Sequence, residues 1–113
     1  MAKFMILYNS SMSASDLMAN ATPEQMQASM AEWIAWKDEA EKNFKFEFGM
    51  PLQAAGRINT SGSTSSDSQV SGYSMIEGDK DGVVEALKSH PHLKREGAYI
   101  DLLEVLPMPG INA

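Results

Sequence analysis

The sequence predicts an α+β protein of ferredoxin-like order, β-α-β-β-α-β, with an antiparallel four-stranded sheet and two helices on one face. Three observations predict it. Apolar runs typical of strands stand near both ends of the chain, a capped amphipathic helix follows the first run, and a shorter helix pattern precedes the last. Right-handed crossovers would place both helices on the same face. The 113 residues suit a single domain, 1–113, with a loose tail at 107–113.

The first half of the chain predicts one strand and one long helix. Residues 3–9 are rich in apolar and aromatic types, as in a buried strand, and residues 10–21 resemble a connecting segment with at most one loose turn. The stretch TPEQ at 22–25 combines a capping box with a proline at the first helical position. We expect a helix from there to about Phe46, closed by the GMP stretch at 49–51.

This long helix is amphipathic. At 100° per residue its apolar side chains share one arc of about 160°. They are Met26, Met30, Trp33, Ile34, Trp36, Ala40 and Phe44. We expect this arc to lie on the sheet, which makes Trp33 and Trp36 core residues first and candidate ligand contacts second.

The second half of the chain predicts the remaining strands. Residues 52–60 predict the second strand, 61–68 a polar flexible loop, 70–77 a third strand by its alternation, and 98–106 the last strand. Between the last two strands, Asp79 or Asp81 can cap a short helix with Val83, Val84 and Leu87 on its apolar face. Pro91 is expected to end that helix.

The first and last strands are apolar on both of their faces. Residues 4–8 and 100–105 place large side chains at odd and even positions alike. Two helices can cover only one face of the sheet. A second copy of the same sheet is the simplest cover for the other, so we expect a two-fold homodimer.

Composition excludes several classes of function. The net charge of −6 disfavours nucleic-acid binding, and the absence of cysteine excludes disulfides and thiolate metal sites. No apolar run approaches the roughly 20 residues that span a bilayer, and the apolar N-terminal stretch is too short for a signal peptide. We therefore expect a cytoplasmic protein without membrane contact. No phosphate-binding loop or nucleophile elbow is present, and we expect no cofactor.

Several short stretches resemble the YCII-related (DGPF-type) family, in the order that the family has them. They are KFMILY at 3–8, MAEWIAW at 30–36, PLQAAG at 51–56, SGYSMIE at 71–77 and HPHL at 90–93. The resemblance implies a dimeric α+β barrel, in which two ferredoxin-like sheets close around a pocket. The family consists largely of small proteins without settled functions, some of them proposed to be enzymes with a His-Asp pair.

The chain departs from the family in two places. The Asp-Gly-Pro-Phe turn is absent, and SDSQV at 66–70 stands near its position. No histidine lies on the long helix, where members with the His-Asp pair carry one, and Trp33 and Trp36 occupy that region instead. The pair therefore cannot be carried over to any residue of this chain, which weakens an enzymatic role.

Three residues are candidates for acid–base chemistry. His90 can be a base or ligand at a pocket edge, or a histidine that packs its ring at a helix C-terminus. His92 can partner Asp101 or a backbone carbonyl, or stand in a loop. Asp101 lies within the last strand, either lining a pocket or facing solvent. Pro91 separates the histidines and no carboxylate stands at a supporting spacing, so we expect no metal site.

Four further residues are candidates for ligand binding, besides the two tryptophans. Tyr8, Tyr73 and Tyr99 lie on predicted strands and could supply ring area and hydroxyl groups to a pocket. Arg57 could hold a ligand carboxylate with its guanidinium fork, or be a solvated cation.

Our first hypothesis is a small homodimer that binds a small organic molecule, between sheet and helix or between the two sheets. The alternative is a lyase or isomerase that moves a proton on a small, aromatic-derived substrate. In that case Asp101 or a histidine would be the base, and Tyr73 or Arg57 would position the ligand. A third class is a structural or regulatory dimer without a ligand. The sequence leaves the ligand and the question of catalysis open.

Overall fold

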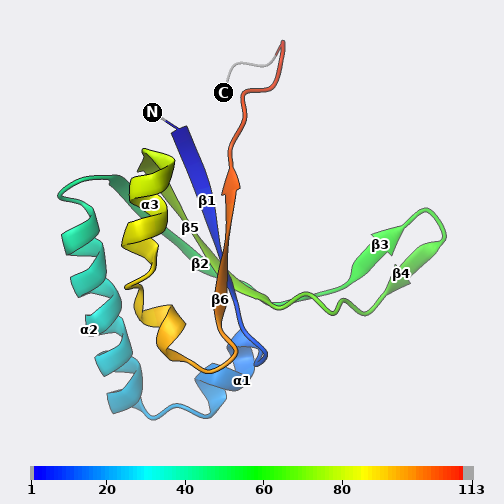
Figure 1. Ribbon diagram of the computed structural model, residues 1–113. Coiled ribbons are helices and arrows are strands. Elements are labelled where there is room, and N and C mark those ends of the chain that lie inside the picture. The colour runs from blue at the N-terminus through cyan, green and yellow to red at the C-terminus, as the bar shows by residue number, and fades with distance from the viewer. Residues whose placement is uncertain (1, 111–113) are drawn as a thin grey trace.

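The computed structural model describes residues 2–110, which form an α+β architecture around a four-stranded antiparallel sheet (Figure 1). Its strands are β1 (Ala2–Asn9), β2 (Lys45–Pro51), β5 (Val70–Gly78) and β6 (Tyr99–Glu104). They lie in the order β2-β5-β1-β6, so the first strand of the chain is central and the last is at an edge. The strand order and directions are compatible with the predicted ferredoxin-like fold.

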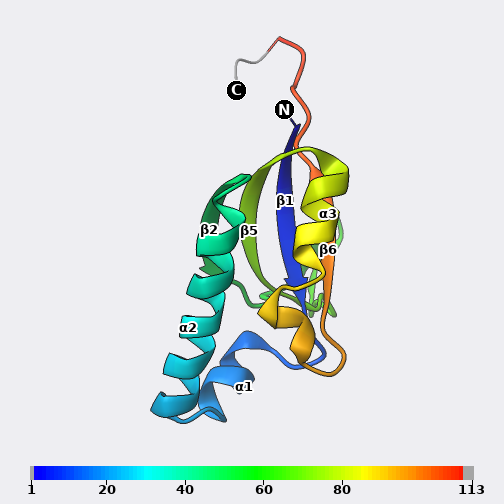
Figure 2. The same ribbon diagram turned by 60° about the vertical axis from the view of Figure 1, so that its left-hand side comes forward.

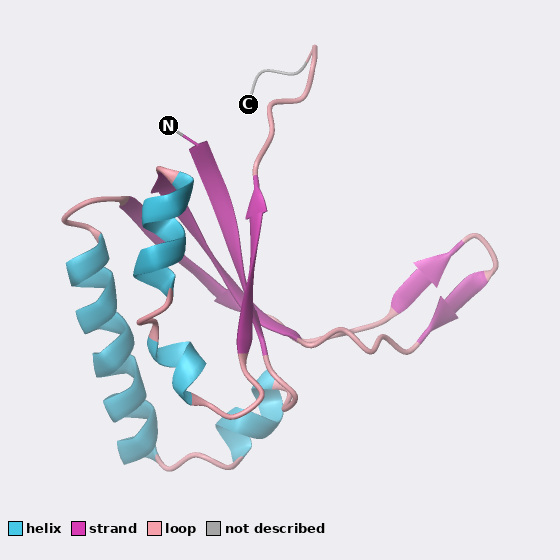
Figure 3. Cartoon of the chain, viewed as in Figure 1, coloured by secondary structure: helices cyan, strands magenta, loops and turns pink. Residues whose placement is uncertain are grey.

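Two helices cover one face of this sheet, as predicted (Figure 2, Figure 3). They are α2 (Pro23–Ala40) and α3 (Lys80–Leu87). A short helix, α1 (Ala14–Ala19), and a 3-10 turn, η1 (Pro91–Lys94), lie at one end of the sheet. Within residues 2–110, none of the helices has the length and apolar character needed to cross a membrane.

The helix α2 begins as predicted and ends earlier. Thr22 and Gln25 form the capping box, since each accepts a hydrogen bond from the other's backbone N–H. The helix stops at Ala40 rather than near Phe46, and β2 begins at Lys45. The alternation of Phe46 and Phe48 with charged residues is a strand pattern that places both rings toward the helices. The predicted helix extended over the start of this strand, because Phe44 also fits the apolar arc of the helix.

The predicted second strand at 52–60 is also wrong, because the helix was expected to occupy the residues where the second strand of the sheet begins. The strand that joins the sheet is β2, and the chain then leaves the sheet as a separate hairpin of β3 (Arg57–Asn59) and β4 (Gly62–Thr64). We call residues 52–69 the arm. The segment expected to be a flexible loop, 61–68, contains one of its two strands. The later elements agree better: β5, the Asp79 cap of α3 and β6 are all present.

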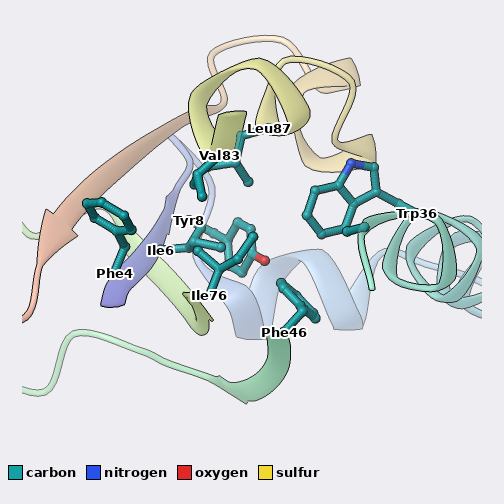
Figure 4. Close-up of a cluster of buried hydrophobic side chains, with 9 residues drawn as sticks. Phe4, Ile6, Tyr8, Trp36, Phe46, Ile76, Val83 and Leu87 are labelled. Carbon is teal, nitrogen blue, oxygen red and sulfur yellow. The ribbon is translucent and has the colours of Figure 1, made fainter. Parts of the chain in front are cut away.

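The core lies between the sheet and the two helices (Figure 4). Its most buried apolar side chains are Phe4, Ile6, Ile76 and Val83, each 2% exposed or less. The helix α2 contributes less than predicted, because residues 23–32 are all exposed. Of its apolar arc, Trp36 and Ala40 are buried, Trp33 and Phe44 are half-buried, and Met26, Met30 and Ile34 are exposed.

Among residues 2–110, no helix lies on the other face of the sheet, which we call the open face (Figure 1). Strand register places an apolar centre there, because Met5 is opposite both Met75 and Leu103, and Leu7 is opposite Tyr73. Charged residues surround this centre, among them Lys45, Glu47, Glu77 and Asp101. The tail predicted at 107–113 follows β6 as exposed coil up to Gly110, and 111–113 lie outside the described residues.

Candidate functional site

Five of the nine predicted site residues lie together beneath the helices. They form what we call the histidine cluster: Tyr8, Trp33, Trp36, His90 and His92. The ring of His90 is at the centre, with its centroid 4.5 Å from that of Trp33 and also 4.5 Å from that of Trp36. Strand β1, helix α2 and the segment before and within η1 each supply part of it.

A directed chain of hydrogen bonds runs through this cluster. The backbone N–H of His92 donates to Nδ1 of His90 over 3.0 Å, so Nδ1 carries a lone pair. In the neutral ring the proton is then on Nε2, which lies 3.3 Å from the Tyr8 hydroxyl and can donate to it. The Tyr8 hydroxyl in turn donates to Oγ of Ser74 over 2.9 Å. Both ring nitrogens of His90 and the hydroxyl groups of Tyr8 and Ser74 therefore have hydrogen-bond partners.

The sequence left open whether His92 contacts Asp101 or a backbone carbonyl, and the structure shows the carbonyl. Its Nε2 lies 2.8 Å from the backbone carbonyl of Asn9, and a carbonyl only accepts, so this nitrogen carries the proton. The side-chain amide of Asn9 lies on the other side and donates to Asp101 over 3.4 Å. The partner of His92 is therefore the Asn9 carbonyl, and Asn9 stands between His92 and Asp101.

Burial keeps the cluster neutral. It lowers the pKa of His90 to about 3, with the nearby His92 as a smaller cause. It also lowers the pKa of His92, although the hydrogen bond to the Asn9 carbonyl acts in the opposite direction. Burial raises the pKa of the Tyr8 hydroxyl to about 12, partly offset by its hydrogen bond to Ser74. With Nδ1 occupied and Nε2 protonated, His90 has no free lone pair with which to accept a proton.

The position of His90 differs from the one predicted. Helix α3 ends at Leu87, three residues before His90, and Pro91 begins η1 rather than ending α3. His90 is the N-cap of that 3-10 turn, because its ring accepts the backbone N–H of His92. The proline was interpreted as a stop signal, but a fixed φ also suits the first position of a new turn.

The other four predicted site residues lie elsewhere. Asp101 and Tyr73 are on the open face, on opposite sides of Leu7, and Tyr99 is paired in register with Asn9. Arg57 is on the arm, where its guanidinium pairs with Asp67 over 2.6 Å and holds the pKa of that carboxyl below its usual value. The three tyrosines therefore share no single pocket within one chain, because Tyr8 faces the helices and Tyr73 faces away.

Two polar residues of the site were not predicted. Ser74 is 1% exposed and accepts the hydrogen bond of the Tyr8 hydroxyl. Asn9 is 3% exposed and connects the histidine cluster to the open face. The alternation of β5 could have identified Ser74, because Ser74 lies on the same strand face as the buried Ile76. A small hydroxyl on a buried strand face needs a partner, and Tyr8 lies within reach.

A groove of about 270 Å³ lies between α3, η1 and the edge strand β6. We call it the β6 groove, and it is lined by Val84, Leu87, Lys88, Leu93, Ala98, Tyr99, Ile100 and Leu102. Most of these side chains are apolar, and Lys88 is the one charged residue among them. Leu93 belongs to the same turn as His92, so η1 separates the groove from the histidine cluster.

A second and wider hollow, of about 690 Å³, lies where α2 turns into β2. Charged side chains occupy much of its lining, including Glu41, Lys45, Glu47 and Glu77. Pockets for small organic molecules are mostly apolar with few polar groups. The β6 groove has that character and the wider hollow does not.

Across residues 2–110, no three potential metal-ligating side chains of His, Cys, Asp or Glu gather into one group. No protein-family model matches the chain, and no curated protein has a matching sequence. The choice of site therefore depends on the geometry of the described residues.

Proposed function

We propose that the protein is a homodimer of the YCII-related type that binds a small, mainly apolar organic molecule in the β6 groove. One observation carries the proposal: three separate elements hold apolar side chains around an unfilled space of about 270 Å³. Sites for small organic molecules are concave and lined mainly by apolar side chains with a few polar groups, and this groove has that lining.

The lining of the groove indicates the class of ligand. Aliphatic side chains from α3, η1 and β6 would contact an apolar or aromatic body. The ammonium group of Lys88 pairs with Glu85 over 2.9 Å and is exposed, so it can turn toward an acidic group on the ligand. A small carboxylic acid or phenol with an apolar body fits this combination best.

The arrangement favours binding over catalysis. His90 is 2% exposed, both of its ring nitrogens are engaged, and the low pKa keeps the ring neutral. A general base needs a free lone pair within reach of the substrate. Asp101 is exposed on the open face, away from the groove. We therefore place the proton-transfer alternative second.

The open face supports the homodimer. Its centre is apolar, its surroundings are charged, and no helix or strand of the described part of the chain covers it. Such a patch with a polar rim is typical of protein interfaces. A two-fold axis would stack the open faces of two copies, as in the barrel that the family resemblance implies. Light scattering should then give about twice the mass of one chain at micromolar concentration.

Thermal unfolding in the presence of small acids and phenols tests the ligand. A compound that binds only the folded protein must raise the melting temperature. The variant Val84→Gln places an amide in the groove, at a residue that is 40% exposed and so tolerates the change. We expect it to reduce the shift produced by every active compound.

The matched control is Met26→Gln. Met26 is 44% exposed, is also helical, and lies on α2 away from the groove. Equal shifts in the wild type and in both variants would place the ligand elsewhere. No shift with any compound would favour the third hypothesis, a dimer without a ligand.

A further inference from the structure

We propose that the arm of one protomer extends across to a second copy of the chain and lies against its body. The proposal depends on the homodimer of the proposed function and adds a second interface to it. The open face would bring the two sheets together, and the two arms would clasp the pair.

The hairpin of the arm makes few contacts with the rest of its own chain. Strands β3 and β4 pair with each other, and among the described residues neither packs extensively against another element. Every residue from 52 to 69 is exposed except Gly56 and Ser66, which are half-buried. Ile58 is 78% exposed, the highest value among the large hydrophobic residues that are exposed. An isolated two-stranded hairpin is marginally stable in water, so this one needs a surface.

The direction of the arm identifies where that surface lies. In Figure 1 the helices are on the left of the sheet and the arm extends to the right, and in Figure 2 the helices are in front and the arm is behind. Both views place the arm on the side of the open face. It therefore projects into the space that a second copy would occupy when it covers that face.

The molecule is flat and extended, as expected for one subunit of a two-fold dimer. The shortest extent of the molecule is 21 Å, one sheet and one helix layer, against 48 and 43 Å in the other two directions. The radius of gyration is 15.8 Å, whereas a compact domain of this length has about 13 Å. The extended arm accounts for part of the excess, and a partner would fill the space beside it.

The charges of the arm suit a second copy better than an oppositely charged partner. Residues 52–69 contain two charged residues, Arg57 and Asp67, and these pair with each other. The arm is thus neutral and presents Ile58 among small polar side chains. A basic partner would be expected to meet an acidic arm, and nucleic acid a basic one. A neutral arm with an exposed aliphatic residue suits a second copy of the chain, against whose body it would lie beside the stacked open faces.

An armless variant tests the clasp. The backbone N–H of Leu52 donates to the carbonyl of Ser71 over 2.9 Å, so β2 and β5 remain paired up to the base of the arm. Replacing residues 54–67 with Asn-Gly therefore leaves a short hairpin connection. We expect this variant to fold and to dimerise at least about tenfold more weakly in sedimentation equilibrium.

A point substitution gives the matched comparison. Ile58→Asp should raise the dimer dissociation constant, because it places a charge in the apolar contact. Asn59→Asp adds the same charge at the next position, whose side chain points to the opposite side of the strand, and should have a much smaller effect. Equal effects would mean that charge alone weakens the dimer, which would overturn the contact through Ile58.

The absence of cysteine allows the contact to be located directly. A spin label on Ser61→Cys, mixed with isotope-labelled wild-type chains, reports by line broadening only on the partner copy. We expect broadening at backbone amides of the partner's sheet, within residues 2–9, 45–51, 70–78 and 99–104. Broadening confined to residues 52–69 would show two arms meeting each other and would overturn the proposal.

The outcomes separate the clasp from the proposed function. If the armless variant dimerises as tightly as the wild type, the clasp is wrong and the face-to-face dimer stands. If the wild type is monomeric at every concentration, both interfaces are wrong. The thermal-shift result for the β6 groove tests ligand binding independently of either.

Discussion

The two faces of the sheet are built from the same strands and end in different states. On the helix side, Phe4, Ile6 and Ile76 are 2% exposed or less, and the polar groups among them are all hydrogen-bonded. On the open face, Leu103 is 51% exposed and its cross-strand neighbour Met5 is half-buried. The helices cover the first face, and the apolar centre of the second is left exposed among the described residues.

Different features of the sequence determine which residues share a face and which face the helices cover. Alternation along a strand determines which residues share a face, but both faces of β1 are apolar, so alternation alone does not say which one the helices cover. The small residues of β5 mark the helix side, where Gly78 leaves room for the ring of Phe44. The open face carries larger side chains at the matching positions, Tyr73 and Met75.

Shortening one side chain on each face tests whether the two faces of the sheet differ in this way. Ile6→Ala should lower the free energy of unfolding by about 2–5 kcal/mol, because it leaves a cavity in a fully buried site. Leu103→Ala should have a smaller effect that grows with protein concentration, because its side chain is 51% exposed in one chain and would be buried by the proposed dimer. Urea unfolding at two protein concentrations measures both.

A concentration-independent loss for Leu103→Ala would mean that the open face contributes only to the monomer. Equal losses for the two variants would remove the distinction between the faces.

Breaking the hydrogen-bond network of the histidine cluster should give the next largest loss in the free energy of unfolding. Tyr8→Phe leaves the buried groups of Ser74 and His90 without their partner, and should lower the free energy of unfolding by about 1–3 kcal/mol. The control is Tyr99→Phe, which removes an exposed hydroxyl that donates to Gln69. We expect little change there, and chemical denaturation compares the two directly.

The neutral state of His90 should make stability depend on pH. Its pKa is about 3 in the folded protein and 6.5 in the unfolded chain, so the unfolded state binds more protons between these values. Stability is therefore present above pH 6.5 and lost as the pH falls toward 3, with a slope of up to about 1.4 kcal/mol per pH unit. His92 contributes in the same direction.

The variant His90→Gln should flatten this dependence. The informative range is pH 7 to 5, where few carboxyl groups of an unfolded chain titrate. Free energies of unfolding measured across that range should fall less steeply for the variant than for the wild type. An unchanged slope would mean that His90 is charged, or open to solvent, in the folded protein.

Much of the fold could be predicted from the sequence, and the errors have a common cause. The capping box at Thr22 and the Asp79 cap are local signals that depend on a few neighbouring residues, and both were confirmed. The boundary between α2 and β2 was wrong because Phe44 satisfies a helical arc while Phe46 and Phe48 satisfy a strand. Only pairing with β5, a contact distant in sequence, decides between the two patterns.

The site was less predictable, since it depends on contacts between distant residues. His90 and Tyr8 are 82 positions apart, and their contact exists because β1 and the segment before η1 meet at one end of the sheet. Sequence spacing suggested a helical histidine and could not show that Nδ1 caps a turn. The role of Arg57 also changed, because the strand expected to carry it left the sheet as part of the arm.

The smallest effect concerns the part of α2 that neither face supports. Residues 23–32 are exposed, so local hydrogen bonds replace burial there, and the capping box is the strongest of them. Thr22→Ala should lower the free energy of unfolding by about 0.5–1 kcal/mol, because Gln25 loses its acceptor at an exposed helix end that can fray. Thr22→Ser keeps the acceptor and should be nearly neutral. Hydrogen exchange offers the finer measurement: protection should fall at the first amides of α2 in the alanine variant and stay unchanged in β1. A loss of protection that spread into β1 would mean that the exposed turns and the covered face unfold as one unit.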